Sequence, residues 1–98
     1  MNLKFLWDPD KEKLNRAKHK ISFAQACFVF TDKFALTLYD CKHSQNEERW
    51  ITLGMTNNNL ILVVAHTYRT SLGIEYVRII SARKATKNET KQYHKRRL

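Results

Sequence analysis

The stretch "RWITLGMTNNNLILVVAHTYRTSLGIEYVRIISAR", residues 49–83, decides the fold. It holds three apolar runs rich in β-branched and aromatic residues, and the short polar segments "NNN" and "TSLGI" separate them. Consecutive runs with such short connections predict hairpins and therefore an antiparallel sheet. The preceding run "FALTLYD", residues 34–40, supplies a fourth strand.

The lengths of these connections also predict the register of the sheet. Tight loops place Trp50 opposite His66 and Thr67 opposite Arg78. Arg49 then joins Thr67 and Arg78 in one row across three strands. A slip of either hairpin by one residue would exchange the two faces.

The segment before the sheet predicts one more strand and two helices. Alternating apolar residues in the segment 3–7 indicate a short opening strand. Asp8 as the N-cap, followed by proline, begins a helix that should end near His19. Ser22 and Gln25 form a capping box for a second, short helix. Its buried positions are expected to be Phe23, Ala26, Cys27 and Phe30.

The segment that follows the sheet, residues 86–97, has a helical composition without a breaker. The order of elements is therefore strand, two helices, four strands and a helix, with the helices expected on one face of the sheet. At 98 residues and 43% hydrophobic composition, the chain fits one α+β domain, residues 1–98, that buries roughly 60 to 70% of its unfolded surface.

The charge of the chain indicates polyanionic partners. Eighteen Lys and Arg against nine Asp and Glu give a net charge of +9, which favours nucleic acid, a membrane surface or an acidic protein. The longest apolar run, residues 60–65, is far shorter than the ~20 residues that span a bilayer, and no signal peptide is evident. We expect a cytoplasmic protein that does not associate with membranes.

The sequence offers few residues suited to binding a metal ion or a cofactor. The acidic residues do not cluster, and the four histidines have no mutual ligand spacing. Cys27 and Cys41 lack ligand spacing as well, and we expect both to be reduced. No phosphate-binding loop or nucleophile elbow is present. The sequence therefore predicts no metal site and no cofactor.

RNA cleavage without a metal ion needs groups that move protons and cations that stabilise charge on the phosphate. The strands and the last helix supply such side chains, namely Arg49, His66, Arg69, Arg78, Arg83 and Tyr93. Each also has a structural interpretation: the arginines as solvent-facing charges, His66 as a core residue and Tyr93 as a packing residue. Glu48 can pair with a neighbouring cation. A basic module that binds nucleic acid or an acidic partner without chemistry is the alternative interpretation, and a structural subunit whose basic face meets a protein partner is a third.

Four ordered segments of the chain resemble the BrnT family of bacterial type II toxins. They are "FLWDPDKEKLNRAKHKISFAQACFVFTD", "EERWITLGMT", "LILVVAHTYR" and "RIISARKATKNETKQY", which together extend over residues 5–93. The resemblance implies a RelE-like ribonuclease fold and a toxin that cleaves RNA and inhibits translation. It also implies a hetero-oligomer with an antitoxin whose ribbon-helix-helix region binds operator DNA; the toxin would meet that DNA only through the antitoxin.

The resemblance further implies roles for individual residues. Arg69 and Arg83 would stabilise the phosphate and the transition state, and Tyr93 would donate a proton or position the substrate. Further candidates for the catalytic site are Arg49, Glu48 and His66, and the candidates for RNA binding are Arg78, Lys84, Lys87 and Lys91. In the predicted register Arg83 lies roughly 17 Å along its strand from Arg78, which conflicts with Arg69 and Arg83 contacting one phosphate.

The chain departs from the family pattern at two places. Lys20 stands where the family usually has a glycine after the first helix, and Glu47-Glu48 replaces the usual Gly-Glu before Arg49.

Overall fold

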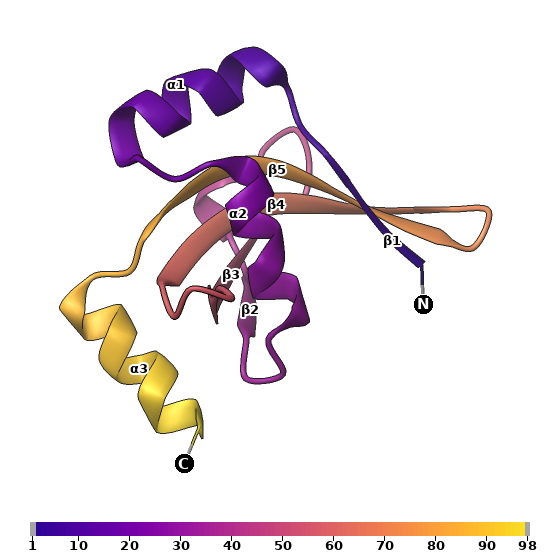
Figure 1. Ribbon diagram of the computed structural model, residues 1–98. Coiled ribbons are helices and arrows are strands. Elements are labelled where there is room, and N and C mark those ends of the chain that lie inside the picture. Colours follow the sequence, from indigo (N-terminus) through magenta and orange to yellow (C-terminus); the bar gives the residue numbers. More distant parts are fainter. Residues whose placement is uncertain (1, 98) are drawn as a thin grey trace.

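In the computed structural model, which describes residues 2–97, five strands form one mixed sheet in the order β1-β5-β4-β3-β2 (Figure 1). The strands are β1 (Asn2–Leu6), β2 (Leu36–Tyr39), β3 (Trp50–Met55), β4 (Ile61–Ser71) and β5 (Ile74–Lys84). Strands β2 to β5 are antiparallel neighbours, as predicted. The sheet is nevertheless not wholly antiparallel, because β1 pairs in parallel with the outer edge of β5.

The helices begin where their capping residues predict. They are α1 (Pro9–His19), α2 (Phe23–Ala26) and α3 (Lys87–Arg97), with the 3-10 turns η1 (Cys27–Thr31) and η2 (Cys41–His43). The side chain of Asp8 accepts a hydrogen bond from the Asp10 amide at 2.9 Å, and that of Ser22 accepts one from the Gln25 amide at 3.0 Å. The predicted second helix is only one turn long and continues as η1.

The two faces of the sheet are covered to different extents. The covered face, which includes Leu62 and Val64 of β4, packs against α1, α2 and η1 through buried residues such as Phe23. The open face, which includes Val63 and Ala65, is covered by α3 at one end only. The expectation that all helices lie on one face is therefore wrong: α1 and α3 lie on opposite sides (Figure 1).

Strand β3 passes close beneath η1 on the covered face. A Cβ atom added at Gly54 would lie 3.0 Å from the Cβ of Val29 and 3.3 Å from that of Ala35. Because these contacts are tighter than most that real Cβ atoms make, a larger residue at this position would require Val29 or Ala35 to shift.

Helix α1 is joined to β5 by one buried side chain. Strand β1 ends opposite Arg78, so the outer edge of β5 beyond that point lacks a strand partner. The Asn15 side chain takes that place, since it donates to the Ala82 carbonyl at 2.8 Å and accepts from the Ala82 amide at 3.1 Å. The buried backbone groups of Ala82 are thereby satisfied.

The predicted register is confirmed, with Trp50 opposite His66 and Thr67 opposite Arg78. The structure adds a β-bulge: His66 pairs with Ile79 but Ala65 pairs with Ser81, so Ile80 is an extra residue. Side chains in a regular strand alternate between faces, and residues five apart therefore point in opposite directions. The bulge cancels that alternation and places Arg78 and Arg83 on the same, open face.

Helix α3 is held against the open face by a buried tyrosine. The Tyr93 hydroxyl donates to Asp32 Oδ2 at 2.6 Å, and the same oxygen accepts from the Met55 amide at 2.8 Å. Tyr93 packs with Leu53 and Val63. Within residues 2–97, no helix has the length and apolar character needed to cross a bilayer.

Candidate functional site

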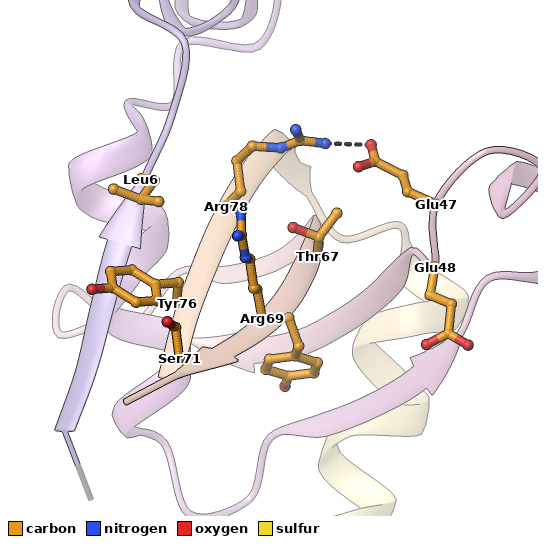
Figure 2. A pocket seen from close by; sticks show the side chains of 9 residues that line it. Leu6, Glu47, Glu48, Thr67, Arg69, Ser71, Tyr76 and Arg78 are labelled. Atoms are coloured by element: carbon orange, nitrogen blue, oxygen red, sulfur yellow. Dashed lines mark hydrogen bonds and ion pairs between the residues drawn. The ribbon is translucent and has the colours of Figure 1, made fainter. Parts of the chain in front are cut away.

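Four arginines project from the part of the open face that α3 leaves uncovered, and they line two neighbouring hollows. The first, called the arm pocket here, has a volume of about 590 Å³ and contains Arg69 and Arg78 (Figure 2). The second, called the groove, has a volume of about 240 Å³ and contains Arg49 and Arg83. The loop of residues 40–49 forms one wall of both.

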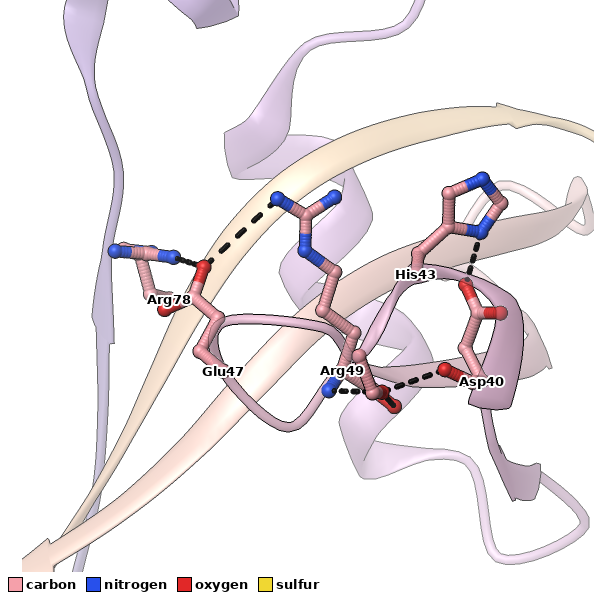
Figure 3. A network of polar contacts seen from close by, with 6 residues as sticks. Asp40, His43, Glu47, Arg49 and Arg78 are labelled. Atoms are coloured by element: carbon pink, nitrogen blue, oxygen red, sulfur yellow. Dashed lines mark hydrogen bonds and ion pairs between the residues drawn. The ribbon is translucent and has the colours of Figure 1, made fainter.

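The groove holds a histidine that a carboxylate orients. The single turn η2 places Asp40 and His43 three residues apart, and His43 Nδ1 lies 2.8 Å from Asp40 Oδ2 (Figure 3). His43 is exposed, whereas the Asp40 side chain is largely buried. A carboxylate bound to one ring nitrogen fixes the orientation of the ring and leaves the other nitrogen to exchange protons. In His43 that second nitrogen is Nε2.

Arg49 is fixed in the groove through its backbone. Its amide donates to Ser44 Oγ at 2.9 Å, and its carbonyl accepts from the Asp40 amide at 2.9 Å. In Figure 3 its guanidinium group lies between Glu47 and His43. The Arg49 Nε atom is buried and has no hydrogen-bond partner among residues 2–97. The loop therefore holds a cation next to the histidine, and one buried donor of that cation is left without a partner.

Arg83 is held by a bidentate ion pair with Glu89 of α3. Arg83 Nη1 and Nη2 donate to the two carboxylate oxygens at 2.8 and 2.9 Å. These bonds raise the pKa of Arg83 and lower that of Glu89 to about 2. Because Glu89 binds the Nη1–Nη2 edge, the Nε–Nη2 edge still carries two parallel donors, which suit a phosphate.

Glu89 also caps the N-terminus of helix α3, which begins at Lys87. It forms a capping box with Thr86: the Thr86 amide donates to Glu89 Oε1 at 2.8 Å, and the Glu89 amide donates to Thr86 Oγ1 at 3.2 Å. One carboxylate thus positions both the helix and the guanidinium group of Arg83.

The structure divides the predicted arginines into two pairs. Arg49 and Arg83 share the groove, while Arg69 and Arg78 share the arm pocket, which Glu48 also lines. Arg69 and Arg83 do not line a common hollow, in agreement with their predicted separation along the strands. The predicted lysines, Lys84, Lys87 and Lys91, are exposed at the end of β5 and on α3.

His66 and Tyr93 lie in the interior. His66 is 0% exposed on the covered face, and its Nε2 lies 2.7 Å from the hydroxyl oxygen of Thr52. Burial lowers the pKa of His66 to about 4. Tyr93 is 1% exposed in the cluster beneath α3. Neither residue lines the groove or the arm pocket.

Sequence reasoning missed Asp40 and His43: Asp40 stands at the end of the predicted strand of residues 34–40, and no role was assigned to the histidine that follows it. The signal was the spacing in "DCKH", because an aspartate three residues before a histidine can contact it within one helical turn. No group of three or more His, Cys, Asp or Glu side chains in residues 2–97 could hold a metal ion.

Two comparisons with known proteins found matches for this chain. The sequence model of the ribonuclease toxin BrnT of type II toxin-antitoxin systems matches residues 7–89. The crystal structure of the Brucella abortus ribonuclease toxin, BrnT, is similar, with a TM-score of 0.65 and 27% sequence identity. That similarity covers 88% of this chain and 100% of the Brucella chain. No curated protein matches the sequence.

Proposed function

The chain belongs to the BrnT family of ribonuclease toxins of type II toxin-antitoxin systems, and we propose that it cleaves RNA in the groove without a metal ion. The observation that carries this proposal is the oriented histidine, His43 on Asp40, in a groove that also contains Arg49 and Arg83. These side chains supply a proton-transfer group and two cations, which are the parts that the reaction requires.

The reaction begins when the 2′-hydroxyl oxygen of a ribose attacks the adjacent phosphorus atom. A bond forms between the 2′ oxygen and phosphorus, and the bond to the 5′ oxygen of the next nucleotide breaks. The products are a 2′,3′-cyclic phosphate and a 5′-hydroxyl group. His43 Nε2 accepts the 2′-hydroxyl proton, and the protonated imidazole then gives that proton to the leaving 5′ oxygen, directly or through water.

The arginines act on the phosphate itself. Negative charge builds on the phosphate oxygens as the fifth bond to phosphorus forms, and guanidinium groups stabilise that charge most when they are already in position. Glu89 fixes the guanidinium group of Arg83, and two hydrogen bonds fix the backbone of Arg49. Arg83 is therefore oriented before RNA binds.

The family also implies a cognate antitoxin. We propose that it carries a ribbon-helix-helix region, forms a hetero-oligomer with this chain in the cytoplasm, and blocks the basic open face. Expression of the chain without the antitoxin would then arrest growth by inhibiting translation.

A cleavage assay on antitoxin-free protein tests the catalytic proposal. We expect cleavage of single-stranded RNA in excess EDTA, and we expect His43→Gln to lower the rate by about 10² to 10⁴ while the protein stays folded. His94→Gln, which removes an exposed histidine of α3 outside both hollows, is the matched control and should keep the rate. RNA left intact by the unmodified protein, or full activity in His43→Gln, would contradict the proposal.

A further inference from the structure

We infer that the arm pocket binds a nucleotide of single-stranded RNA next to the phosphate that is cleaved in the groove. The inference rests on the proposed function and adds to it a second subsite, built on the outer halves of β4 and β5. Four features of the pocket carry it: paired arginines, an internal anion, an aromatic wall and continuity with the groove.

The arginines of the pocket are diagonal neighbours on one face of a hairpin. Arg69 pairs with Tyr76 and Thr67 pairs with Arg78, and all four side chains lie on the open face. Diagonal side chains on an antiparallel pair are within reach of one another when they are long. Arg69 and Arg78 therefore present two guanidinium groups to the same space (Figure 2).

A carboxylate of the chain already occupies an anion position between two guanidinium groups. Glu47 Oε1 is hydrogen-bonded to Arg78 Nη2 and lies 3.8 Å from Arg49 Nη2 (Figure 3). This carboxylate oxygen stands where a phosphate oxygen would bind. Glu47 and Arg78 are both exposed, and exposed ion pairs contribute little to stability, so an entering phosphate displaces Glu47 at little cost.

The pocket also contains a wall suited to a base. The half-buried ring of Tyr76 lies beside the hydroxyl group of Ser71, and Thr67 lies across the pocket (Figure 2). An aromatic ring beside arginines is the arrangement on which single-stranded bases stack, with their phosphates held by the cations. The volume of about 590 Å³ lies within the range of small-molecule sites.

The pocket and the groove are contiguous. Ala65 lines the groove and Thr67 lines the pocket, and these residues are neighbours on the same face of β4, about 7 Å apart along the strand. Glu47 of the pocket contacts Arg49 of the groove. An RNA strand cleaved in the groove can therefore continue directly into the pocket.

Binding of two short probes tests the subsite without relying on cleavage. The first probe is a fluorescent 2′-O-methyl RNA tetramer, and the second is a fluorescent 2′-O-methyl sugar-phosphate tetramer without bases. Both lack the attacking hydroxyl group. Tyr76→Leu should weaken binding of the first probe about tenfold and leave the second unchanged. Tyr76→Phe should keep full affinity, because it keeps the ring.

Changes of charge test the phosphate contact. Arg78→Gln should weaken both probes and reduce the salt dependence of binding by about 0.7 in log–log slope, the value for one phosphate of a single strand. Glu47→Gln should increase the affinity for both probes, because it removes the carboxylate that competes with the phosphate. The matched controls are Tyr39→Leu, an exposed tyrosine at the far edge of the sheet, and Arg16→Gln, an exposed arginine of α1 that is also paired with one glutamate; neither should change binding.

Equal losses on both probes in Tyr76→Leu would overturn the nucleotide subsite and would favour an acidic protein segment as the occupant. Affinities in Tyr76→Leu and Arg78→Gln that match those of the controls would overturn it as well. The probes cannot be cleaved, so their binding does not depend on catalysis. Binding as expected without cleavage of RNA would contradict only the catalytic proposal.

Discussion

His66 and His43 lie on opposite faces of the same sheet, and they differ in each property that decides whether a histidine can exchange protons. His66 is fully buried on the covered face, where it packs against Phe30 and forms a hydrogen bond with Thr52. His43 is exposed beside the groove, and a carboxylate binds its Nδ1. The histidine within the strongest strand pattern is thus structural, and the one that we propose for proton transfer lies in the loop of residues 40–49.

The two faces show the same division on a larger scale. The covered face holds the main apolar cluster and anchors α1 and α2. The open face keeps its cations in contact with solvent, because α3 covers one end only. One face supplies stability and the other leaves polar groups free to meet a ligand.

The largest expected effect on stability comes from His66. Its pKa is about 4 in the folded protein against 6.5 for an exposed histidine, so between these values the unfolded chain takes up a proton that the folded protein does not. The free energy of unfolding should therefore fall as the pH is lowered from about 6.5 to 4, by about 3 kcal/mol in total. Urea unfolding at several pH values measures this change in the free energy of unfolding.

His66→Gln separates this effect from other titrating groups, because glutamine can still bind Thr52 but carries no proton equilibrium. The variant should lose the pH dependence between 6.5 and 4. The Glu89–Arg83 pair loses its contribution only at lower pH, as Glu89 becomes protonated between about 4.5 and 2. An identical pH profile in both proteins would mean that His66 is not the group responsible.

A smaller effect on stability is expected from Tyr93, which lies where α3 covers one end of the open face. Tyr93→Phe removes the hydrogen bond to Asp32 and should lower the free energy of unfolding by about 2 kcal/mol, since the acceptor is a carboxylate. Because Tyr93 does not line the groove, the cleavage rate at a temperature where the variant is folded should stay within about twofold. A hundredfold loss of rate would instead support the catalytic role that the family resemblance implies for this tyrosine.

The smallest effect concerns Lys20, at the turn between α1 and α2 over the covered face. Its φ is 61°, in the left-handed region that favours glycine. Lys20→Gly should raise the free energy of unfolding by about 0.5 to 1 kcal/mol, as measured by urea titration. Lys20→Ala removes the same charge but keeps the Cβ atom, so it should show no comparable gain.

Local signals in the sequence were sufficient for much of the fold. Asp8 and Ser22 mark the helix starts because capping depends on a few adjacent residues, and the hairpin loops determine the pairing of Trp50 with His66 because they are short. The parallel position of β1 was not predictable in this way. It depends on which edge of the sheet remains open after the hairpins form, which is a property of the whole fold.

The candidate site was predictable only in part. Alternation along strands places arginines on a face, but the extra residue Ile80 changes which face Arg83 occupies, and two consecutive isoleucines do not reveal it. The polar segment that contains His43 has no periodicity, so the only local signal of its contact with Asp40 is their spacing of three residues, which predicts a contact only if the segment forms a helical turn. Burial of His66 depends on how η1 crosses β3, which no local pattern encodes.

The bulge at Ile80 shapes the strand more than it selects the residues that face the groove. Deletion of this one codon would leave Arg83 four positions after Arg78, so regular alternation would keep both arginines on the open face, with Ser81 still opposite Ala65. The strand would lose the bend and the added twist that a bulge produces. Among related chains, a one-residue gap at Ile80 should therefore be compatible with a complete set of arginines, and it would change the angle between the two ends of β5 and not the order of charges along it.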